Sequence, residues 1–110
     1  MSADNVMKTL RHLTQERCAD VKLLAALSRR FHGHAEEFFP PQIDELLGLF
    51  ATLGYSDEYL MNGTLGRLQD VAGVASPRRV IRLMRDCTAL RWPAEEWFPE
   101  VLPALHRNLP

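Results

Sequence analysis

The feature of this sequence that most constrains its fold is a phrase that recurs after 37 residues. The segment TLGYSDEYLM begins at position 52, and the segment ALRWPAEEWF begins at position 89. Each contains a leucine, a turn-forming stretch, acidic residues and a pair of apolar residues. Sliding the chain on itself by 37 residues reveals a third, earlier copy without a gap. Segments this short cannot cover their own apolar faces, so recurring ones are expected to stack.

The repeat aligns apolar residues in two blocks. The first block aligns Val6 with Ile43 and Val80, Leu10 with Leu47 and Met84, and Leu13 with Phe50 and Cys87. The second block aligns Leu23 with Leu60 and Trp97, Leu24 with Met61 and Phe98, and Phe31 with Leu68 and Leu105. Over residues 43–53 and 80–90 the apolar spacing is i, i+3, i+4, i+7 and i+10, which is one stripe of an amphipathic helix.

These patterns predict an all-α fold built from three antiparallel helical hairpins. The predicted helices span residues 3–15 with 20–32, 40–53 with 57–71, and 77–90 with 94–108. The units, about 3–34, 40–71 and 77–108, are expected to form one domain over residues 1–110. Three such units are about the minimum that stands alone, and we expect them to stack as a short right-handed α-solenoid.

Helix-terminating residues agree with these boundaries. Ser76 followed by Pro77 predicts an N-cap with proline in the first turn, and the prolines at 40–41 open the preceding unit. Ser56 stands before two acidic residues, which favour the positive end of a helix dipole. Gly73 is a candidate for the end of that helix.

Prolines and glycines also predict irregularities. Pro99 and Pro103 interrupt the last helix, which is therefore expected to be kinked, to begin late near Pro99, or to be shorter than its counterparts. Gly63 and Gly66 reduce helix propensity in the fourth helix, so we expect them to mark a close helix crossing.

Two stretches resemble the heptatricopeptide and octatricopeptide repeats of organellar proteins. IDELLGLFATLGYSDEYL, from Ile43 to Leu60, is similar to the first helix and turn of heptatricopeptide units, and WPAEEW, from Trp92 to Trp97, resembles the turn of octatricopeptide units. The resemblance covers about residues 40–105. It implies a mitochondrial or plastid location and RNA handling. The chain departs from these families in its few repeats and in having no appended RNA-associated domain, so independent, sequence-specific reading of RNA is not expected.

Composition narrows the classes of partner. The formal net charge of −1 provides no general attraction to nucleic acid or anionic lipid, so such binding would need a local patch. No apolar run approaches the ~18 residues of a membrane span. Cys18 and Cys87 are expected to be reduced, buried thiols in an intracellular compartment.

The N-terminal segment carries mixed signals about targeting. Lys8, Arg11 and Arg17 suggest a mitochondrial presequence, whereas Asp4 and Glu16 count against one because such peptides are poor in acids. Since the segment also matches the first repeat, we expect it to belong to the fold.

The strongest candidate site is a basic ridge on the helix at 77–90. Arg78, Arg82 and Arg85 lie on one helix face opposite the apolar stripe, and Arg79 flanks them. Guanidinium groups pair bidentately with phosphate, so one interpretation is an RNA-binding surface. An acidic protein surface is a second interpretation, and a solvated helix face is a third.

The ridge has a partial counterpart in the earlier units. Lys8 and Arg11 occupy the equivalent places in the first unit, and we include them in the candidate surface. Glu45 and Gly48 interrupt the line in the second unit.

Aromatic residues cluster at the last turn. Trp97 and Phe98 align with Leu60 and Met61 and are expected in the core. Trp92 sits at the turn itself, where a large aromatic can stay partly exposed and anchor a partner. Stacking on an RNA base is the alternative role for these rings.

No pattern predicts catalysis, a cofactor, a metal site or a small-molecule substrate. His32 and His34 flank Gly33, but two histidines without a nearby cysteine fall short of zinc-site spacing, so a surface connector is expected there. The adjoining Phe38 and Phe39 are expected to tuck under that connector. No glycine-rich segment matches a phosphate-binding loop, and no nucleophile–base pattern is present.

The sequence therefore predicts a non-catalytic binding or scaffold subunit of a larger organellar assembly, with the mitochondrion as the favoured organelle. A ribonucleoprotein such as the mitochondrial ribosome would use protein contacts and RNA contacts. An accessory subunit of a respiratory-chain or ATP synthase complex would use protein contacts only. A free adaptor for single-stranded RNA is a further alternative, with salt-sensitive binding.

Overall fold

The computed structural model describes residues 2–107 as helices joined by short turns, with no strand in that range. The elements are α1 (Ala3–Gln15), α2 (Val21–Gly33), the 3-10 helix η1 (Ala35–Glu37), α3 (Pro40–Leu53), α4 (Glu58–Leu65), α5 (Leu68–Val74), α6 (Pro77–Ala89) and α7 (Ala94–Arg107). The all-α prediction is confirmed. Most predicted boundaries lie within one residue of those observed, and the predicted end of the last helix, residue 108, lies outside the described residues.

The predicted helix over 57–71 is wrong in one respect, because the structure divides it into α4 and α5. Gly66 ends α4, and Arg67 leaves the helical conformation with φ −120° and ψ 3°. The Arg67 guanidinium donates to the carbonyls of Ala35 and Phe38 at 2.6 and 3.1 Å. This side chain therefore ties the helix break to the connector between α2 and α3. Gly73, predicted to end the helix, lies inside α5.

The last helix tolerates both of its prolines. α7 runs from Ala94 to Arg107 with Pro99 and Pro103 inside it. Its 14 residues match the longest of the other helices, so the predictions of a late start and of a shortened helix are both wrong. Burial of Trp97, Val101 and Ala104 along one side of the helix offsets the lost backbone hydrogen bonds.

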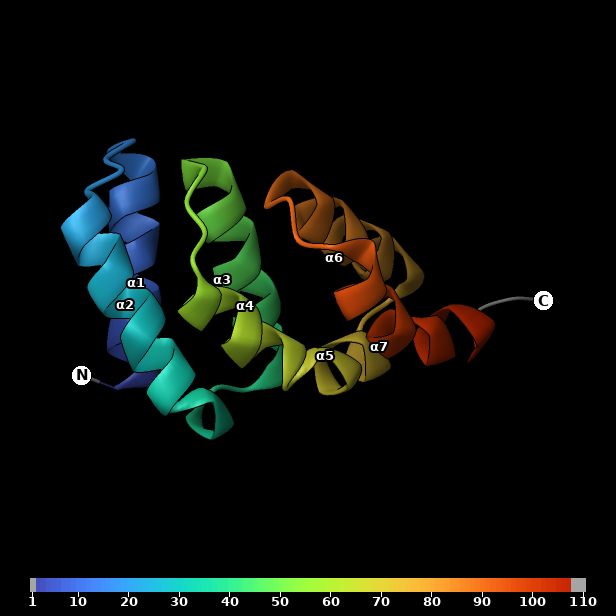
Figure 1. The fold of residues 1–110 in the computed structure, drawn as a ribbon. Coiled ribbons are helices and arrows are strands. Elements are labelled where there is room, and N and C mark those ends of the chain that lie inside the picture. Colours follow the sequence, from blue (N-terminus) through green and yellow to red (C-terminus); the bar gives the residue numbers. More distant parts are fainter. Residues whose placement is uncertain (1, 108–110) are drawn as a thin grey trace.

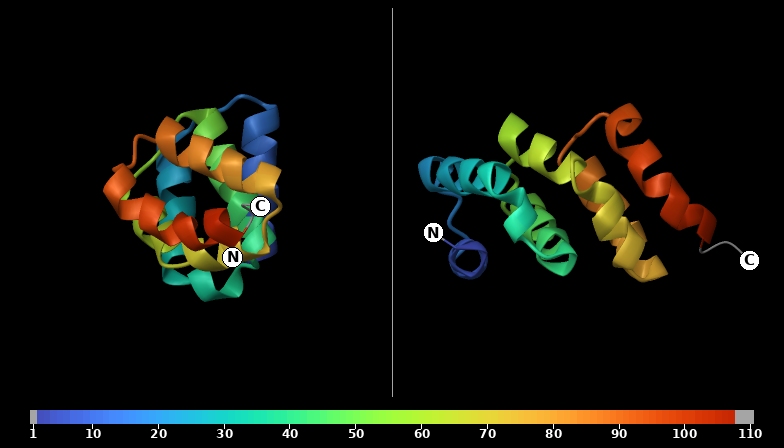
Figure 2. Two further views of the ribbon diagram at one scale, coloured as in Figure 1. Left: turned by 90° about the vertical axis from the view of Figure 1, so that its right-hand side faces the viewer. Right: turned by 90° about the horizontal axis from the view of Figure 1, so that it is seen from below.

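The helices pack in two rows. In the first row α1 contacts α3, and α3 contacts α6; in the second row α2 packs against α4, and α5 packs against α7. Figure 1 shows α1 and α2 at one end of the molecule and α6 and α7 at the other. The right view in Figure 2 shows the same order along the long axis of a molecule that measures 43 × 24 × 23 Å.

The aligned apolar residues form the core between the rows. Val6, Ile43 and Val80 are at most 1% exposed. Burial of each such side chain contributes roughly 1.5–3 kcal/mol relative to exposure. Trp97 is buried as predicted, but Phe98 is 38% exposed and therefore departs from the predicted core position.

The turns after α1, α3 and α6 have the same backbone conformation. Their left-handed residues are Arg17 (φ 52°), Gly54 (φ 71°) and Arg91 (φ 62°), which are spaced by 37 positions. After each of them an amide closes the turn: Cys18 to the carbonyl of Leu13 at 2.8 Å, Tyr55 to Phe50 at 3.1 Å, and Trp92 to Cys87 at 3.1 Å. This bond, from the C″ amide to the C3 carbonyl, belongs to the Schellman motif. Only the middle copy has glycine, the residue that adopts positive φ without strain.

The helix starts follow local capping rules. Ser76 accepts from the amide of Arg79, as predicted. The cap of α4 is Asp57, the residue after Ser56; its carboxylate accepts from the Leu60 amide at 2.8 Å. This leaves the Ser56 hydroxyl free to accept a hydrogen bond from Nε1 of Trp92, in the turn between α6 and α7.

Gly63 confirms the predicted close crossing. A Cβ at this position would lie 2.9 Å from Cε2 of Phe31 and 3.3 Å from Cα of His32. Glycine is therefore required where α4 approaches α2. Gly66 has no such neighbour from another helix within 4 Å, so its prediction is wrong.

Candidate interaction surface

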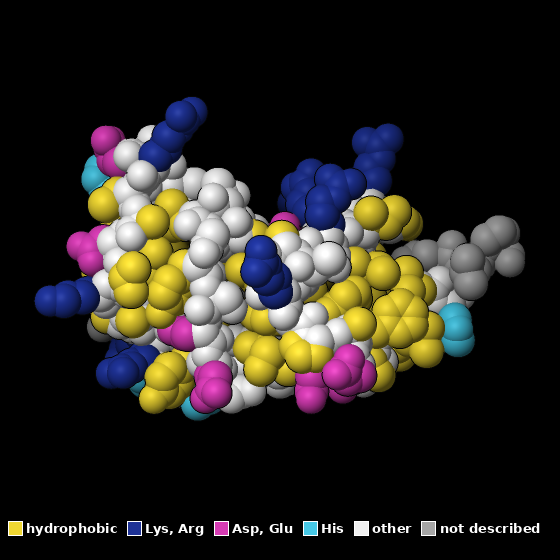
Figure 3. Space-filling view, turned by 45° about the horizontal axis from the view of Figure 1, so that its top comes forward, with side chains coloured by type: hydrophobic (Ala, Val, Ile, Leu, Met, Phe, Trp, Pro, Cys, Tyr) yellow, Lys and Arg dark blue, Asp and Glu magenta, His cyan; other side chains and the backbone are white. Residues whose placement is uncertain are grey.

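The predicted basic ridge lies on the exposed side of α6. Arg78, Arg82 and Arg85 are exposed, and helical geometry places them within about 60° of each other around the axis. Lys and Arg side chains gather at the upper right of Figure 3, over α6. Arg79 leaves this group: its Nη1 donates to Oδ2 of Asp44 on α3 at 3.4 Å.

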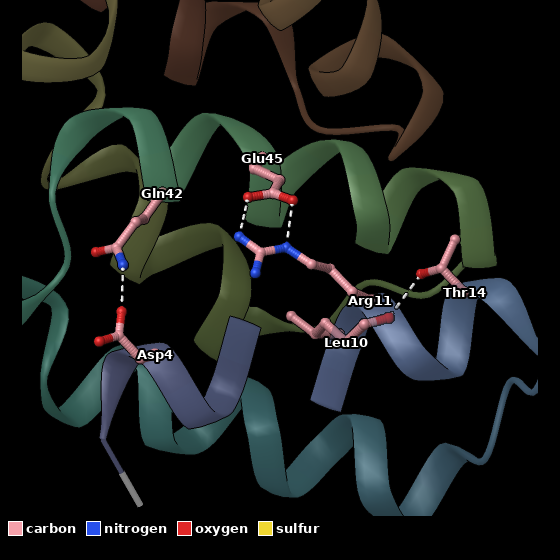
Figure 4. Close-up of polar contacts among 6 residues, drawn as sticks. All are labelled: Asp4, Leu10, Arg11, Thr14, Gln42 and Glu45. Atoms are coloured by element: carbon pink, nitrogen blue, oxygen red, sulfur yellow. Dashed lines mark hydrogen bonds and ion pairs between the residues drawn. The ribbon is translucent and has the colours of Figure 1, made fainter. Parts of the chain in front are cut away.

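The two predicted cations of α1 do not join the α6 ridge. Arg11 donates from Nε and Nη2 to the two carboxylate oxygens of Glu45 on α3, each at 2.7 Å (Figure 4). This hydrogen-bonded pair raises the pKa of Arg11 and lowers the pKa of Glu45. Lys8 is exposed on the same helix. Arg11 is thus engaged within the chain, and only Lys8 of this pair faces solvent without a carboxylate partner in the described residues.

A second polar contact joins α1 and α3 beside this pair. The Gln42 amide Nε2 donates to Oδ1 of Asp4 at 3.0 Å (Figure 4). The Gln42 Oε1 also accepts from the backbone amide of Phe39 at 2.8 Å, which closes the N-terminus of α3. The side of α1 that carries Asp4 and Arg11 therefore faces α3.

A groove of about 470 Å³ lies between α3 and α6, and its carboxylates were not predicted from the sequence. Its lining includes Asp44, Gly48, Arg82 and Asp86. The molecule in Figure 3 is hollowed beside the gathering of basic side chains. Asp44 is only 8% exposed, and Oδ2 of Asp86 is buried without a hydrogen-bond partner.

Burial dominates the electrostatics of this groove. It raises the pKa of Asp44 against the opposing effect of Arg79 and Arg82. It also raises the pKa of Asp86, and the negative charge of Asp44 raises it further. Little in the sequence could have indicated that these carboxylates meet in a groove. Gly48 lies opposite Asp86 and leaves room for its carboxylate, since a Cβ on Gly48 would lie 3.5 Å from Oδ2 of Asp86.

Trp92 is located in the core, not on the surface. It is 6% exposed, and its Nε1 donates to the Ser56 hydroxyl at 2.8 Å. The neighbouring Trp97 Nε1 donates to the Trp92 carbonyl at 3.1 Å. The expectation that Trp92 stays partly exposed and anchors a partner is therefore not met, because burial of the ring and a partner for its N–H compete successfully with exposure at the turn.

Other expectations about side-chain location are met only in part. Phe38 is buried at 2% exposure, but Phe39 is 71% exposed. Cys87 is buried as predicted, and burial raises the pKa of its thiol to about 12. Cys18 is exposed, contrary to prediction. His32 belongs to α2, not to a connector.

This surface presents charged side chains. Among residues 2–107 no three His, Cys, Asp or Glu side chains are placed to hold a metal ion. In the same range no helix is both long enough and apolar enough to cross a bilayer. The surface instead combines exposed guanidinium groups with carboxylates at the helix seams.

Comparison with known proteins gives no family assignment. No protein-family model matches this chain, and no curated protein or solved structure matches it significantly.

Proposed function

We propose that this protein is a non-catalytic scaffold subunit of a larger assembly, in which stacked helical hairpins present docking surfaces. The hairpins are α1 with α2, α3 with α4 and α5, and α6 with α7. Their stacking is that of a short α-solenoid, in which each unit contacts only its neighbours. Docking surfaces lie on the outer helix faces and at the two ends of the stack.

The observation that carries this proposal is one turn used three times. Arg17, Gly54 and Arg91 adopt positive φ at a spacing of 37 positions, although only one of them is glycine. A non-glycine residue at positive φ is uncommon, so its use at two equivalent places indicates one repeated unit. The repeated unit supports a stack, and stacks of helical hairpins act through extended binding surfaces.

Contacts between units support the same arrangement. Side chains about one period apart join neighbouring helices: Arg11 with Glu45, Gln42 with Asp4, and Arg79 with Asp44. In the second row, the Arg107 guanidinium donates to the Ala72 carbonyl at 3.4 Å. Each bond connects a unit to the next, as stacking requires.

The charge distribution favours protein over RNA as the main partner. Arg11 and Arg79 are engaged with Glu45 and Asp44, so two of the six predicted basic residues carry compensated charges. On α6 the other three, Arg78, Arg82 and Arg85, lie on the same exposed side as an apolar residue, Ile81, which is 57% exposed. A phosphate backbone offers nothing apolar to such a residue, whereas a protein surface does.

The proposal is tested by the native size of the protein in its source cells. A tagged copy, expressed at its natural level, is separated on a density gradient with and without ribonuclease. Sedimentation far ahead of a free 12.6 kDa chain supports a scaffold role, and its loss after ribonuclease indicates the ribonucleoprotein setting that the resemblance implies. Recovery of the protein only as a free monomer would contradict the proposal. Cell fractionation in the same experiment tests the mitochondrial location.

A further inference from the structure

One flank of α6 repeats the flank of α1 that is covered by α3. The flank is formed by three register positions, occupied in α1 by Asp4, Met7 and Arg11 and, two periods later in α6, by Arg78, Ile81 and Arg85. The α1 flank contacts α3 through Asp4 and Arg11. No helix of residues 2–107 packs on the α6 flank, because α6 contacts α3 through its other side, at Arg79 and the Asp86 groove.

Burial separates the two flanks sharply. Met7 is 1% exposed on α1, and its equivalent Ile81 is 57% exposed on α6. The next helical turn is alike in both: Thr14 donates to the Leu10 carbonyl at 2.8 Å, and Thr88 donates to the Met84 carbonyl at 2.9 Å. The α6 flank is therefore built like a covered surface and lacks only its cover.

The second row shows the same difference at the same end of the molecule. Leu24 of α2 is fully buried, and α2 packs against α4. Its equivalent two periods later is Phe98 of α7, which is 38% exposed. The end formed by α6 and α7 thus exposes two apolar residues whose equivalents are buried by a neighbouring unit.

We infer that this end docks a helical partner protein whose contacting helix carries carboxylates at positions i and i+3. On α3 the residues that meet the α1 flank are Gln42 and Glu45, which are three positions apart. If the partner helix lies on α6 as α3 lies on α1, its residue equivalent to Glu45 meets Arg85, and its residue equivalent to Gln42 meets Arg78. Both sites present a guanidinium group, so both favour a carboxylate. This inference rests on the proposed scaffold function and names its partner.

The charges argue against a second copy of this chain as the partner. The positions of α1 equivalent to Gln42 and Glu45 are Asn5 and Lys8. A copy docked end to end would place Lys8 against Arg85, and like charges brought together at an interface weaken binding. The wild-type ends therefore discourage polymerisation and leave the α6 flank for an acidic partner.

The test converts the other end of the molecule into the inferred partner. A donor variant carries Asn5→Glu and Lys8→Glu, which present carboxylates at i and i+3, and also Arg78→Glu and Arg85→Glu, which disable its own α6 flank. The donor is mixed with the wild-type chain, and association is measured by analytical ultracentrifugation at low and high salt. Circular dichroism first establishes that every variant is as helical as the wild type.

The expected result is a one-to-one complex between donor and wild type, with at least tenfold weaker affinity at high salt. A matched donor with Asn5→Gln and Lys8→Gln in place of the glutamates should bind at least tenfold more weakly. An acceptor with Arg85→Glu should also lose at least tenfold in affinity for the original donor. Absence of the complex, or equal binding by the Arg85→Glu acceptor, overturns the inference.

RNA is the alternative occupant, and the same proteins test it. The probe is a 20-nucleotide single-stranded RNA. If the wild type binds this RNA more tightly than it binds the donor, and the RNA displaces the donor, the inference is overturned in favour of phosphate binding. Failure here is distinguishable from failure of the scaffold function. If the Arg78→Glu, Arg85→Glu variant still sediments with a large assembly in cells, the scaffold function stands and this docking site is wrong.

Discussion

The seams α1–α3 and α3–α6 use the same register but different chemistry. In the first seam Arg11 makes two short bonds to Glu45, and Gln42 bonds Asp4. In the second seam Arg79 reaches Asp44 through one bond of 3.4 Å. The other carboxylate there, Asp86, has a buried oxygen without a partner.

The two seams also differ in the sign of their effect on ionisation. The first lowers the pKa of Glu45 because Arg11 donates directly to the carboxylate. The second raises the pKa of Asp44 and Asp86 because burial disfavours their charged forms. A repeated backbone therefore fixes where side chains meet, while the identity of each pair decides whether the meeting stabilises the fold.

The largest expected effect on stability is at Gly63, which tests whether the second row of helices holds neighbouring units rigidly. Gly63→Ala should reduce the free energy of unfolding by about 2 kcal/mol, because its Cβ would clash with the fully buried Phe31 ring. The matched control is Gly73→Ala, whose Cβ meets nothing within 4 Å and which should gain about 0.5–1 kcal/mol. Urea unfolding measures both. Equal stability of the two variants would show that α2 and α4 adjust to one another.

Removing the unpartnered carboxylate of Asp86 from the α3–α6 seam should stabilise the protein. Asp86→Asn is expected to raise the free energy of unfolding by about 1 kcal/mol near neutral pH, since a buried unsatisfied charge is costly. A raised folded pKa means stability that is present below the unfolded value of 3.8 and lost as pH rises through the folded pKa. The advantage of the variant should therefore shrink as the pH is lowered towards 3.8.

Urea unfolding from acid to neutral pH measures this dependence. Glu36→Gln, at an exposed residue of η1, serves as the control with little expected change. A destabilised Asp86→Asn protein at neutral pH would mean that the carboxylate makes a net favourable contribution in the groove.

The first seam should show the opposite pH dependence and the smallest effect. A double-mutant cycle of Arg11→Ala and Glu45→Ala is expected to give a small favourable coupling, because the pair is largely exposed. The folded pKa of Glu45 is lowered, so its stabilisation is present above 4.5 and lost as pH falls through the folded pKa. Unfolding measured at neutral and acidic pH, with 0.1 and 1 M salt, tests both points. Coupling that is unchanged by acid would exclude the ionic origin.

The sequence was informative where one helix face or one turn decides the outcome. The apolar stripe containing Val80 and Leu83, the cap at Ser76 and the period that aligns Gly54 with Arg91 follow from local spacing. The positive φ of Arg91 was not anticipated, because arginine gives no local signal for that conformation. Only its register with Gly54 could have indicated it.

The candidate surface was less predictable than the fold. Helical spacing placed Arg78, Arg82 and Arg85 together on the exposed face of α6. It could not show that Arg79 turns to Asp44, since a salt bridge across helices depends on how close the next helix lies. The burial of Trp92 could not be predicted either, because it depends on a distant part of the chain that brings the Ser56 hydroxyl to the indole N–H.

By itself the sequence determined the all-α class, most helix ends and the apolar helix faces, because these depend on the order of apolar and polar residues along a few helical turns. The tertiary structure alone decided the break at Arg67, the carboxylates of the α3–α6 groove and the exposure of Ile81. Each of these depends on what lies across an interface, and residues that meet there are separated by about one period in the chain. Local spacing constrains each face, but only packing shows which faces are covered.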